Sequence, residues 1–229
     1  MPKKLELTPR LQLLADWVPQ GAKFADVGTD HAYLPVWLAV NGRVSFAIAS
    51  DLRKGPLERA KENGARYALV GNLGHLSLVR KVGLIPVGDF RLNATNSESV
   101  LSLESLGFTE VLLSPELTLP QARDISGATS VAVYGRIPLM TLEKCVIKEI
   151  ADCNVCASEK AILTDRRGVS FPVLREWEHR NVVYNSLPTC MSDREDQLLR
   201  ANVLSRHFLF TVETPDEVDR IIQAHRSRQ

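Results

Sequence analysis

The sequence predicts an α/β protein with a largely parallel sheet, either open or forming part of a TIM-like barrel. Three observations support this fold class. Short apolar runs of strand length alternate with segments of helical periodicity from Lys23 to about Tyr134. Glycine, asparagine or a helix-capping residue separates most of these segments. After Gly135 the alternation stops, and a cysteine-bearing loop leads into a hairpin pattern.

The chain begins with the pattern of a Rossmann-like β-α-β unit. An apolar stripe predicts a first helix from about Thr8 to Trp17, closed by Gly21. The unit itself then follows, and its two strands are expected to be parallel with a right-handed crossover. Its expected elements are a strand at 23–27, a helix at 33–40, a strand at 44–50 and a further helix at 57–64.

The next part continues the alternation. Asn96 or Ser97 is a suitable N-cap for one of its helices, and Gly107 a suitable end. We expect strands at 67–70, 85–90, 111–114 and 130–134, and helices at 76–82, 97–106 and 119–125.

Beyond the cysteine loop the pattern predicts an inserted hairpin and then a return to the main sheet. The polar turn Asp165 to Gly168 separates two strand-like runs. The last helix should begin at Thr214-Pro215-Asp216-Glu217, where a cap, a proline and two acids coincide. The expected elements are strands at 161–164, 170–174, 181–184 and 208–212, and a helix at 193–205.

Composition narrows the class of protein. The 229 residues are 45% apolar and 24% charged, which is typical of a folded soluble protein. A formal net charge of +1 excludes an overall basic field as a means of binding nucleic acid, although not a local patch. Because no run of eighteen apolar residues and no secretory signal occur, we expect a cytoplasmic protein without a membrane span. In a reducing compartment its four cysteines are free thiols or metal ligands rather than disulfides.

A nucleotide-binding turn is indicated where the first two strands end, in ADVGTDHAYLP and SDL. A glycine there lets a ligand approach the backbone, and the following helix start offers free N–H groups. Asp51, at the end of the second strand, is placed to accept both ribose hydroxyls. A single glycine fits S-adenosylmethionine better than a dinucleotide, while a βαβ unit without any ligand is the alternative.

Residues 7–63 resemble the opening of the bacterial tRNA (adenine-N1) methyltransferase family. The matching words are LTPRLQLLADWVPQGAKFADVGTDHAYLPVWLA, FAIASD and KGPLERAKEN. The resemblance implies an S-adenosylmethionine site and a tRNA substrate. The residues that it implies for the cofactor are Asp26, Gly28, Asp30, His31 and Asp51.

The cysteines predict a metal site. Cys153 and Cys156 form a C-x-x-C pair, and Cys145 lies eight residues upstream of the pair. Thiolates favour zinc or an iron–sulfur cluster. The fourth ligand is either Cys190 or His179. Ordinary buried or free thiols, or a redox dithiol at the C-x-x-C pair, are the alternatives.

Residues 64–229 resemble the collagenase-like peptidase family U-thirty-two, whose members have a barrel-like α/β domain. The resemblance implies an iron–sulfur protein of the peptidase or RNA-modification class. It implies roles for Tyr134, Gly135 and Arg136 at a strand end, and for Cys145, Cys153 and Cys156 in cluster binding. The matching words are YALVGNLGHL, GDFRLNATNS, LGFTEVLLSPEL, YGRIPLMTLEKC, LTDRRGVSFPV, NVVYNSLP and LFTVET.

Together these patterns predict two units, residues 1–63 and 64–229. The leading functional interpretation is a peptidase-family enzyme-type domain that holds a metal or iron–sulfur cluster, with RNA as a partner and no catalytic residue assigned. The alternatives are an S-adenosylmethionine-dependent tRNA methyltransferase-like protein and a catalytically silent fusion scaffold. Unpaired sheet edges predict a homo-oligomer.

Overall fold

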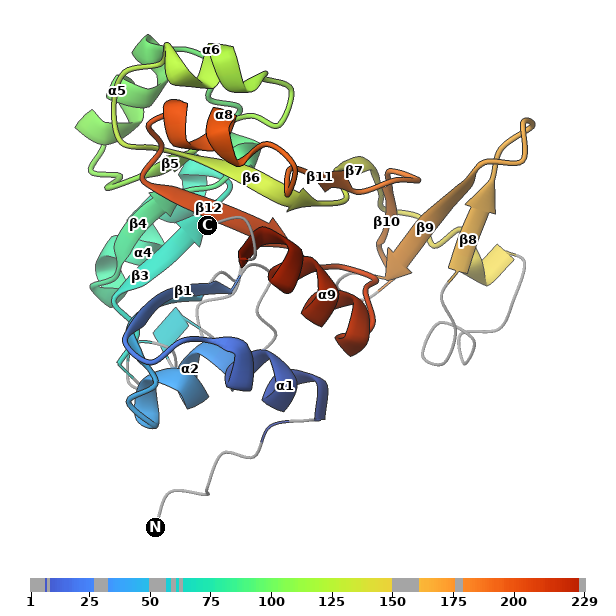
Figure 1. The fold of residues 1–229 in the computed structure, drawn as a ribbon, viewed down its shortest axis with the longest axis horizontal. Helices are drawn as coiled ribbons and strands as arrows, with labels where there is room; N and C mark the ends of the chain where they lie inside the picture. Colours follow the sequence, from blue (N-terminus) through green and yellow to red (C-terminus); the bar gives the residue numbers. More distant parts are fainter. Residues whose placement is uncertain are drawn as a thin grey trace.

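A computed structural model describes residues 7, 9–26, 33–49, 57–58, 61, 64–149, 161–175 and 179–226 of the chain. Its main sheet has eight strands in the order β1-β2-β3-β4-β5-β6, and β11 and β12 both pair with β6. All of these pairings are parallel except that of β11 with β6. Helices surround this sheet (Figure 1), so the predicted α/β class is confirmed.

The strands and helices fall close to the ranges expected from the sequence. The strands of the main sheet are β1 Ala22–Asp26, β2 Val44–Ala49, β3 Tyr67–Val70, β4 Ile85–Gly88, β5 Val111–Leu112, β6 Thr129–Gly135, β11 Thr189–Cys190 and β12 Ser205–Leu209. The helices are α1 Pro9–Trp17, α2 Tyr33–Val40, α4 Leu76–Val82, α5 Ser97–Ser105, α6 Leu119–Arg123, α8 Glu195–Arg200 and α9 Pro215–Arg226. Three short 3-10 turns are η1 Leu73–His75, η2 Phe90–Leu92 and η3 Ile147–Glu149.

The predicted β-α-β start is present as β1, α2 and β2. The two strands run parallel, and Asp26 at the end of β1 is in register with Ala49 at the end of β2. From β1 to β6 the strands follow one another in sequence order, which is the order of a TIM-like barrel. A doubly wound sheet instead reverses its order part-way. The last helix, α9, packs against the first, α1, so elements from the start and the end of the described sequence lie in contact.

Local capping explains why the helices begin where they do. Asn96 accepts a hydrogen bond from the Ser99 amide, and the Ser99 side chain in turn accepts one from the Asn96 amide, which makes a capping box at the start of α5. Thr118 and Gln121 make the same arrangement at α6. The predicted N-cap Asn96 is therefore confirmed.

One hydrophobic cluster extends through most of the main sheet. It includes Val36 and Leu57 from the first predicted unit, and Val133 and Leu198 from the second. The predicted division of the chain after residue 63 stays a prediction. What the cluster does establish is that side chains from both sides of this division share a core.

A second sheet of four antiparallel strands has the order β7-β10-β9-β8. Its strands are β7 Pro138–Leu142, β8 Ala161–Thr164, β9 Ser170–Arg175 and β10 Asn181–Tyr184. The predicted hairpin at 161–174 is confirmed as β8 and β9. The loop expected directly after Gly135 is instead β7, which pairs with β10. We call this four-stranded sheet, residues 138–184, the arm, because it extends to one side of the main sheet in Figure 1.

The helix expected at 193–205 is shorter than its pattern suggested. It covers only Glu195–Arg200, because Asn202 adopts a left-handed conformation with φ of 51° and ends the helical path. The following strand therefore starts earlier than predicted, at Ser205, and pairs with β6 as far as Leu209. Within the described part of the chain, no helix is long and apolar enough to cross a membrane.

Candidate functional site

The carboxyl edge of the main sheet is where a ligand site is expected. In α/β proteins ligands bind at the carboxyl ends of parallel strands. Asp26 stands at that end of β1, beside the last residue of β2, and α2 begins at Tyr33 directly after the predicted cofactor turn. The backbone of β1, α2 and β2 thus has the arrangement that the turn requires.

Most of the predicted cofactor residues lie outside the described part of the chain. These are Gly28, Asp30, His31 and Asp51, and Asp26 is described by its backbone alone. That the five side chains or backbones meet at one ligand stays a prediction.

A buried polar group occupies the same edge at the ends of β6 and β12. The carboxylate of Glu213, a residue only 6% exposed, accepts hydrogen bonds from the Tyr134 hydroxyl at 3.1 Å and from the amides of Thr211 and Val212 at 2.7 and 3.0 Å. The Arg136 Nε lies 3.9 Å from the same carboxylate. Burial, together with the nearby charge of Glu213, raises the pKa of the Tyr134 phenol. This hydroxyl therefore stays protonated and acts as a fixed donor.

Sequence reasoning placed Tyr134, Gly135 and Arg136 at a strand end, and the structure puts all three there. It missed Glu213, which lies after β12 and outside any recognisable pattern of spacing. The signal that could have found it is a lone acid in the apolar run before the Thr214 cap.

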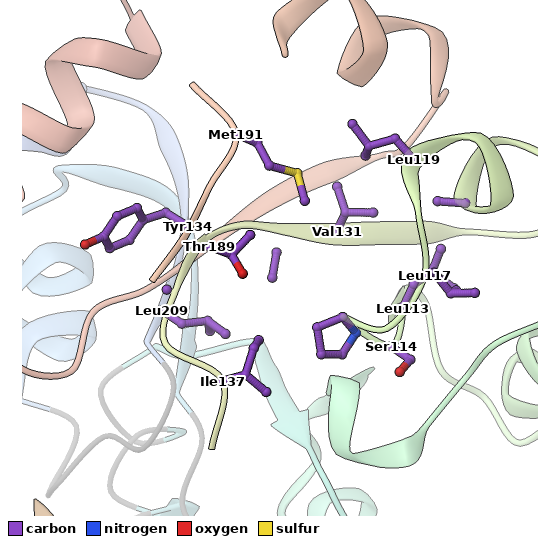
Figure 2. Close-up of a pocket in the computed structure, with 14 residues that line it drawn as sticks. Leu113, Ser114, Leu117, Leu119, Val131, Tyr134, Ile137, Thr189, Met191 and Leu209 are labelled. Carbon is purple, nitrogen blue, oxygen red and sulfur yellow. The ribbon is translucent and has the colours of Figure 1, made fainter. Parts of the chain in front are cut away.

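The enclosed space at this edge is too small for a nucleotide. Figure 2 shows aliphatic side chains such as Met191, Val131 and Leu209 around it, with Ser114 and Tyr134 at its margin. Its volume is about 30 Å³, whereas sites for small-molecule cofactors typically measure about 300–1,000 Å³. It is a packing defect large enough for one water molecule.

A second cluster of titratable groups lies at the opposite, amino edge of the sheet. Ser205 Oγ donates to the Glu110 carboxylate, and His207 Nε2 lies 3.1 Å from Ser205 Oγ and 3.5 Å from Glu110 Oε1. Burial raises the pKa of Glu110, but hydrogen bonds from His207 and Ser205 outweigh it, so the net pKa is lowered. Because serine and glutamate share one imidazole nitrogen, this is not the relay of a nucleophilic triad.

The cysteines that the structure describes, Cys145 and Cys190, lie in different parts of the fold. Cys145 is buried and packs with Ile147, Val173 and Val183 of the arm. Cys190 is exposed on β11 in the main sheet, and its Sγ lies 3.5 Å from Ser192 Oγ.

The remaining predicted metal ligands do not complete a metal site among the described residues. Cys153 and Cys156 lie outside the described residues, and His179 is exposed. Among the side chains that are described, no group of three or more His, Cys, Asp or Glu could hold a metal ion. The four-cysteine ligand set stays a prediction.

Comparison with known proteins bears on the start of the chain. Residues 7–77 match a methyltransferase domain. A tRNA (adenine(22)-N(1))-methyltransferase of Bacillus subtilis (strain 168) is 40% identical over 81 residues, which are 35% of this chain and 33% of the relative. The match thus spans about one third of that relative. It supports the methyltransferase resemblance, and the segment 7–77 includes all five predicted cofactor positions.

Solved structures of tRNA methyltransferases are less similar in sequence to this chain. A tRNA methyltransferase of B. subtilis has a TM-score of 0.26 and 18% identity, covering 80% of this chain and 67% of the other. A Streptococcus pneumoniae protein assigned to the same activity, in complex with S-adenosyl-L-methionine, has a TM-score of 0.26 and 17% identity, covering 78% of this chain and 72% of the other. TM-scores this low do not indicate a shared overall fold.

The leading interpretation of the sequence is wrong. It assigned a collagenase-like peptidase-family enzyme, with hydrolase and iron–sulfur character, whereas the similarity found is to methyltransferases.

A physical reason for the error is visible in the matching words, whose polar residues serve local structure. In GDFRL, buried Asp89 caps η2 by accepting from the Arg91 amide at 3.0 Å. In LTDRRG, Asp165 accepts from the amides of Arg167 and Val169 and so forms the hairpin turn. These patterns therefore indicate caps and turns rather than a catalytic chemistry.

Proposed function

We propose that residues 7–77 bind S-adenosylmethionine and that the chain transfers its methyl group to N1 of an adenine in tRNA. The observation that carries the proposal is the 40% identity to the Bacillus subtilis tRNA methyltransferase over 81 residues. The match of residues 7–77 to a methyltransferase domain also supports it.

The residues assigned to the cofactor are Asp26, Gly28, Asp30, His31 and Asp51. Gly28 would allow the ligand close to the backbone after β1, and the start of α2 would offer its free N–H groups. The Asp51 carboxylate would accept the two ribose hydroxyls. The parallel register of β1 and β2 supports this assignment, because it ends both strands at one edge.

The chemistry asks little of the protein beyond positioning. When bound, S-adenosylmethionine would supply an electrophilic methyl group to adenine N1 and would leave as S-adenosylhomocysteine. Since N1 of adenine is unprotonated at neutral pH, no general base is needed to start the transfer. Orientation of the two reactants then supplies most of the rate enhancement.

Methyl transfer is tested with radiolabelled S-adenosylmethionine and an unmodified tRNA transcript. The proposal predicts incorporation of label, recovered as N1-methyladenosine after digestion. Asp51→Ala should abolish it, and Asp219→Ala, on α9, should not. Absence of label from tRNA with wild-type protein at high concentration would reject the tRNA methyltransferase assignment. The predicted homo-oligomer and cytoplasmic location stay expectations.

A further inference from the structure

The arm is connected to the main sheet at its carboxyl edge, the edge at which we propose that the cofactor binds. Residues 136–137 lead from the end of β6 into β7, and residues 185–188 lead from β10 back to β11. β11 then pairs with Tyr134 and Gly135, the last two residues of β6. Both connections therefore leave the main sheet at one point.

Arg136 joins these two connections. Its Nη1 donates to the carbonyl of Asn185 at 2.9 Å and to that of Ser186, and Asn185 N donates to the Ile137 carbonyl at 2.9 Å. The side chain of Arg136 is only 17% exposed, and its Nε faces the buried Glu213 carboxylate. A cation held by two carbonyls and a carboxylate fixes the direction in which the arm leaves the sheet.

The tip of the arm is a rigid turn. Asp165 Oδ1 accepts from the amides of Arg167 and Val169 at 2.8 and 2.9 Å, and Asp165 N donates to the Val169 carbonyl at 3.0 Å. Gly168 takes the left-handed conformation, with φ of 80°, that such a turn requires. Little conformational entropy would be lost if this turn bound a partner.

This turn carries two arginines that have no acidic partner among the described residues. Arg166 and Arg167 are exposed, and neither makes an ion pair within the described part of the chain. By contrast, Arg180 of the arm pairs with Glu143, and Lys144 pairs with Glu149. The one acid at the tip, Asp165, is engaged with backbone amides. The tip, which lies at the outer end of the hairpin formed by β8 and β9 (Figure 1), therefore carries two exposed positive charges.

We infer that the arm is an RNA-binding element, in which Arg166 and Arg167 contact phosphates of the same RNA whose base enters the carboxyl edge. The partner follows from charge complementarity, since guanidinium groups suit phosphate oxygens and RNA offers them in regular series. The inference rests on the proposed function for the identity of the RNA. It explains how a chain with a net charge of only +1 holds a polyanion: through a local patch rather than an overall field.

The test is the affinity for an unmodified tRNA transcript, measured at several salt concentrations with full-length protein. R166E/R167E should weaken binding by about tenfold or more and should lower the salt dependence by about one unit for each arginine. R166Q/R167Q should show a smaller loss in the same direction. The control R123E/R220E makes the same change in net charge on α6 and α9, and should bind nearly as the wild type does.

The outcomes separate the arm from the proposed function. Equal affinity of wild type and R166E/R167E, or an equal loss in R123E/R220E, would overturn the role of the arm. Heat of S-adenosylmethionine binding should be unchanged in R166E/R167E. If tRNA binding depends on the arm but the protein does not bind S-adenosylmethionine, the proposed function is rejected and the RNA-binding role of the arm is retained.

Discussion

Arg226, in the last turn of α9, donates a hydrogen bond from Nη2 to the carbonyl of Trp17 at the end of α1, at 3.1 Å. Its guanidinium also lies 5.4 Å from the centroid of the Trp17 ring. Arg43 binds the neighbouring carbonyls of Asp16 and Val18, both at 2.8 Å. Two cations from distant parts of the chain therefore cap one helix end, where free carbonyls and the helix dipole favour positive charge.

Removing the distant cation should loosen the first helix. Arg226→Ala is expected to cost about 1 kcal/mol of stability, since a partly exposed hydrogen bond and a cation–π contact are lost. Hydrogen exchange should speed up in α1 more than in α5. The matched control is Arg220→Ala on the same helix, whose Nε only donates to the Asp216 carbonyl. Equal exchange rates in the two variants would contradict a clamp between α9 and α1.

Gly135 should not tolerate a side chain. It adopts φ of 143°, and a Cβ added there would lie 2.5 Å from Leu209 Cβ and 2.7 Å from the Leu209 carbonyl oxygen. Because the backbone of β12 cannot move without losing its pairing to β6, Gly135→Ala should destabilise by about 3 kcal/mol or more.

Gly168→Ala is the control for that substitution. Gly168 has φ of 80°, and a Cβ added there would have no other atom within 4 Å. Gly168→Ala should lower the free energy of unfolding by only about 1 kcal/mol, because it introduces backbone strain without a steric clash. Urea denaturation compares the two variants, and similar midpoints would argue against the close approach of β6 and β12.

Stability should fall in acid because of Glu110. Its pKa is lowered in the folded protein from the ordinary value of 4.5. A lowered carboxyl pKa contributes stability above the unfolded-state pKa, and this contribution is lost as pH falls through the folded-state pKa. Glu110→Gln should therefore flatten the fall in unfolding free energy below pH 4.5. A fall of the same steepness in this variant would contradict the role of Glu110.

Glu213 should hold the root of the arm. Glu213→Gln keeps the shape of the side chain but removes its charge. The hydrogen bond from the Tyr134 hydroxyl should weaken, and the ion pair with Arg136 should be lost, while both groups stay buried. We expect a loss of about 1–3 kcal/mol. Limited proteolysis should then cut residues 185–188 faster than in wild type. Exposed Glu116→Gln is a suitable control, and identical cleavage in both variants would contradict the prediction.

Much of the fold was predictable because local sequence patterns determine most of its helices and strands. β3 and α4 begin and end at the expected residues, Tyr67–Val70 and Leu76–Val82, because glycines and turns bound short periodic segments there. β7 was missed because its Leu139, Met140 and Thr141 are all exposed, so no alternation marks a buried face. Its strand conformation depends on pairing with β10, which lies about forty residues away along the chain.

The site was less predictable than the fold. The turn after β1 could be predicted as a cofactor site because glycine and acids at strand ends follow from how nucleotides are bound, and its role stays a prediction. The function of residues 64–229 was misassigned because polar residues in the matching sequence motifs serve local structure. Asp89 caps a 3-10 turn, and Asp165 stabilises the turn of a hairpin. The Glu213 network joins residues 79 positions apart, and no local pattern encodes a contact over that distance.

The central claim is that residues 7–77 hold S-adenosylmethionine, and calorimetric titration of the full-length protein with this cofactor tests it most directly. The account predicts saturable heat from a single site, lost in Asp51→Ala and kept in Asp219→Ala. No saturable heat from the wild-type protein, or an affinity unchanged by Asp51→Ala, would contradict it.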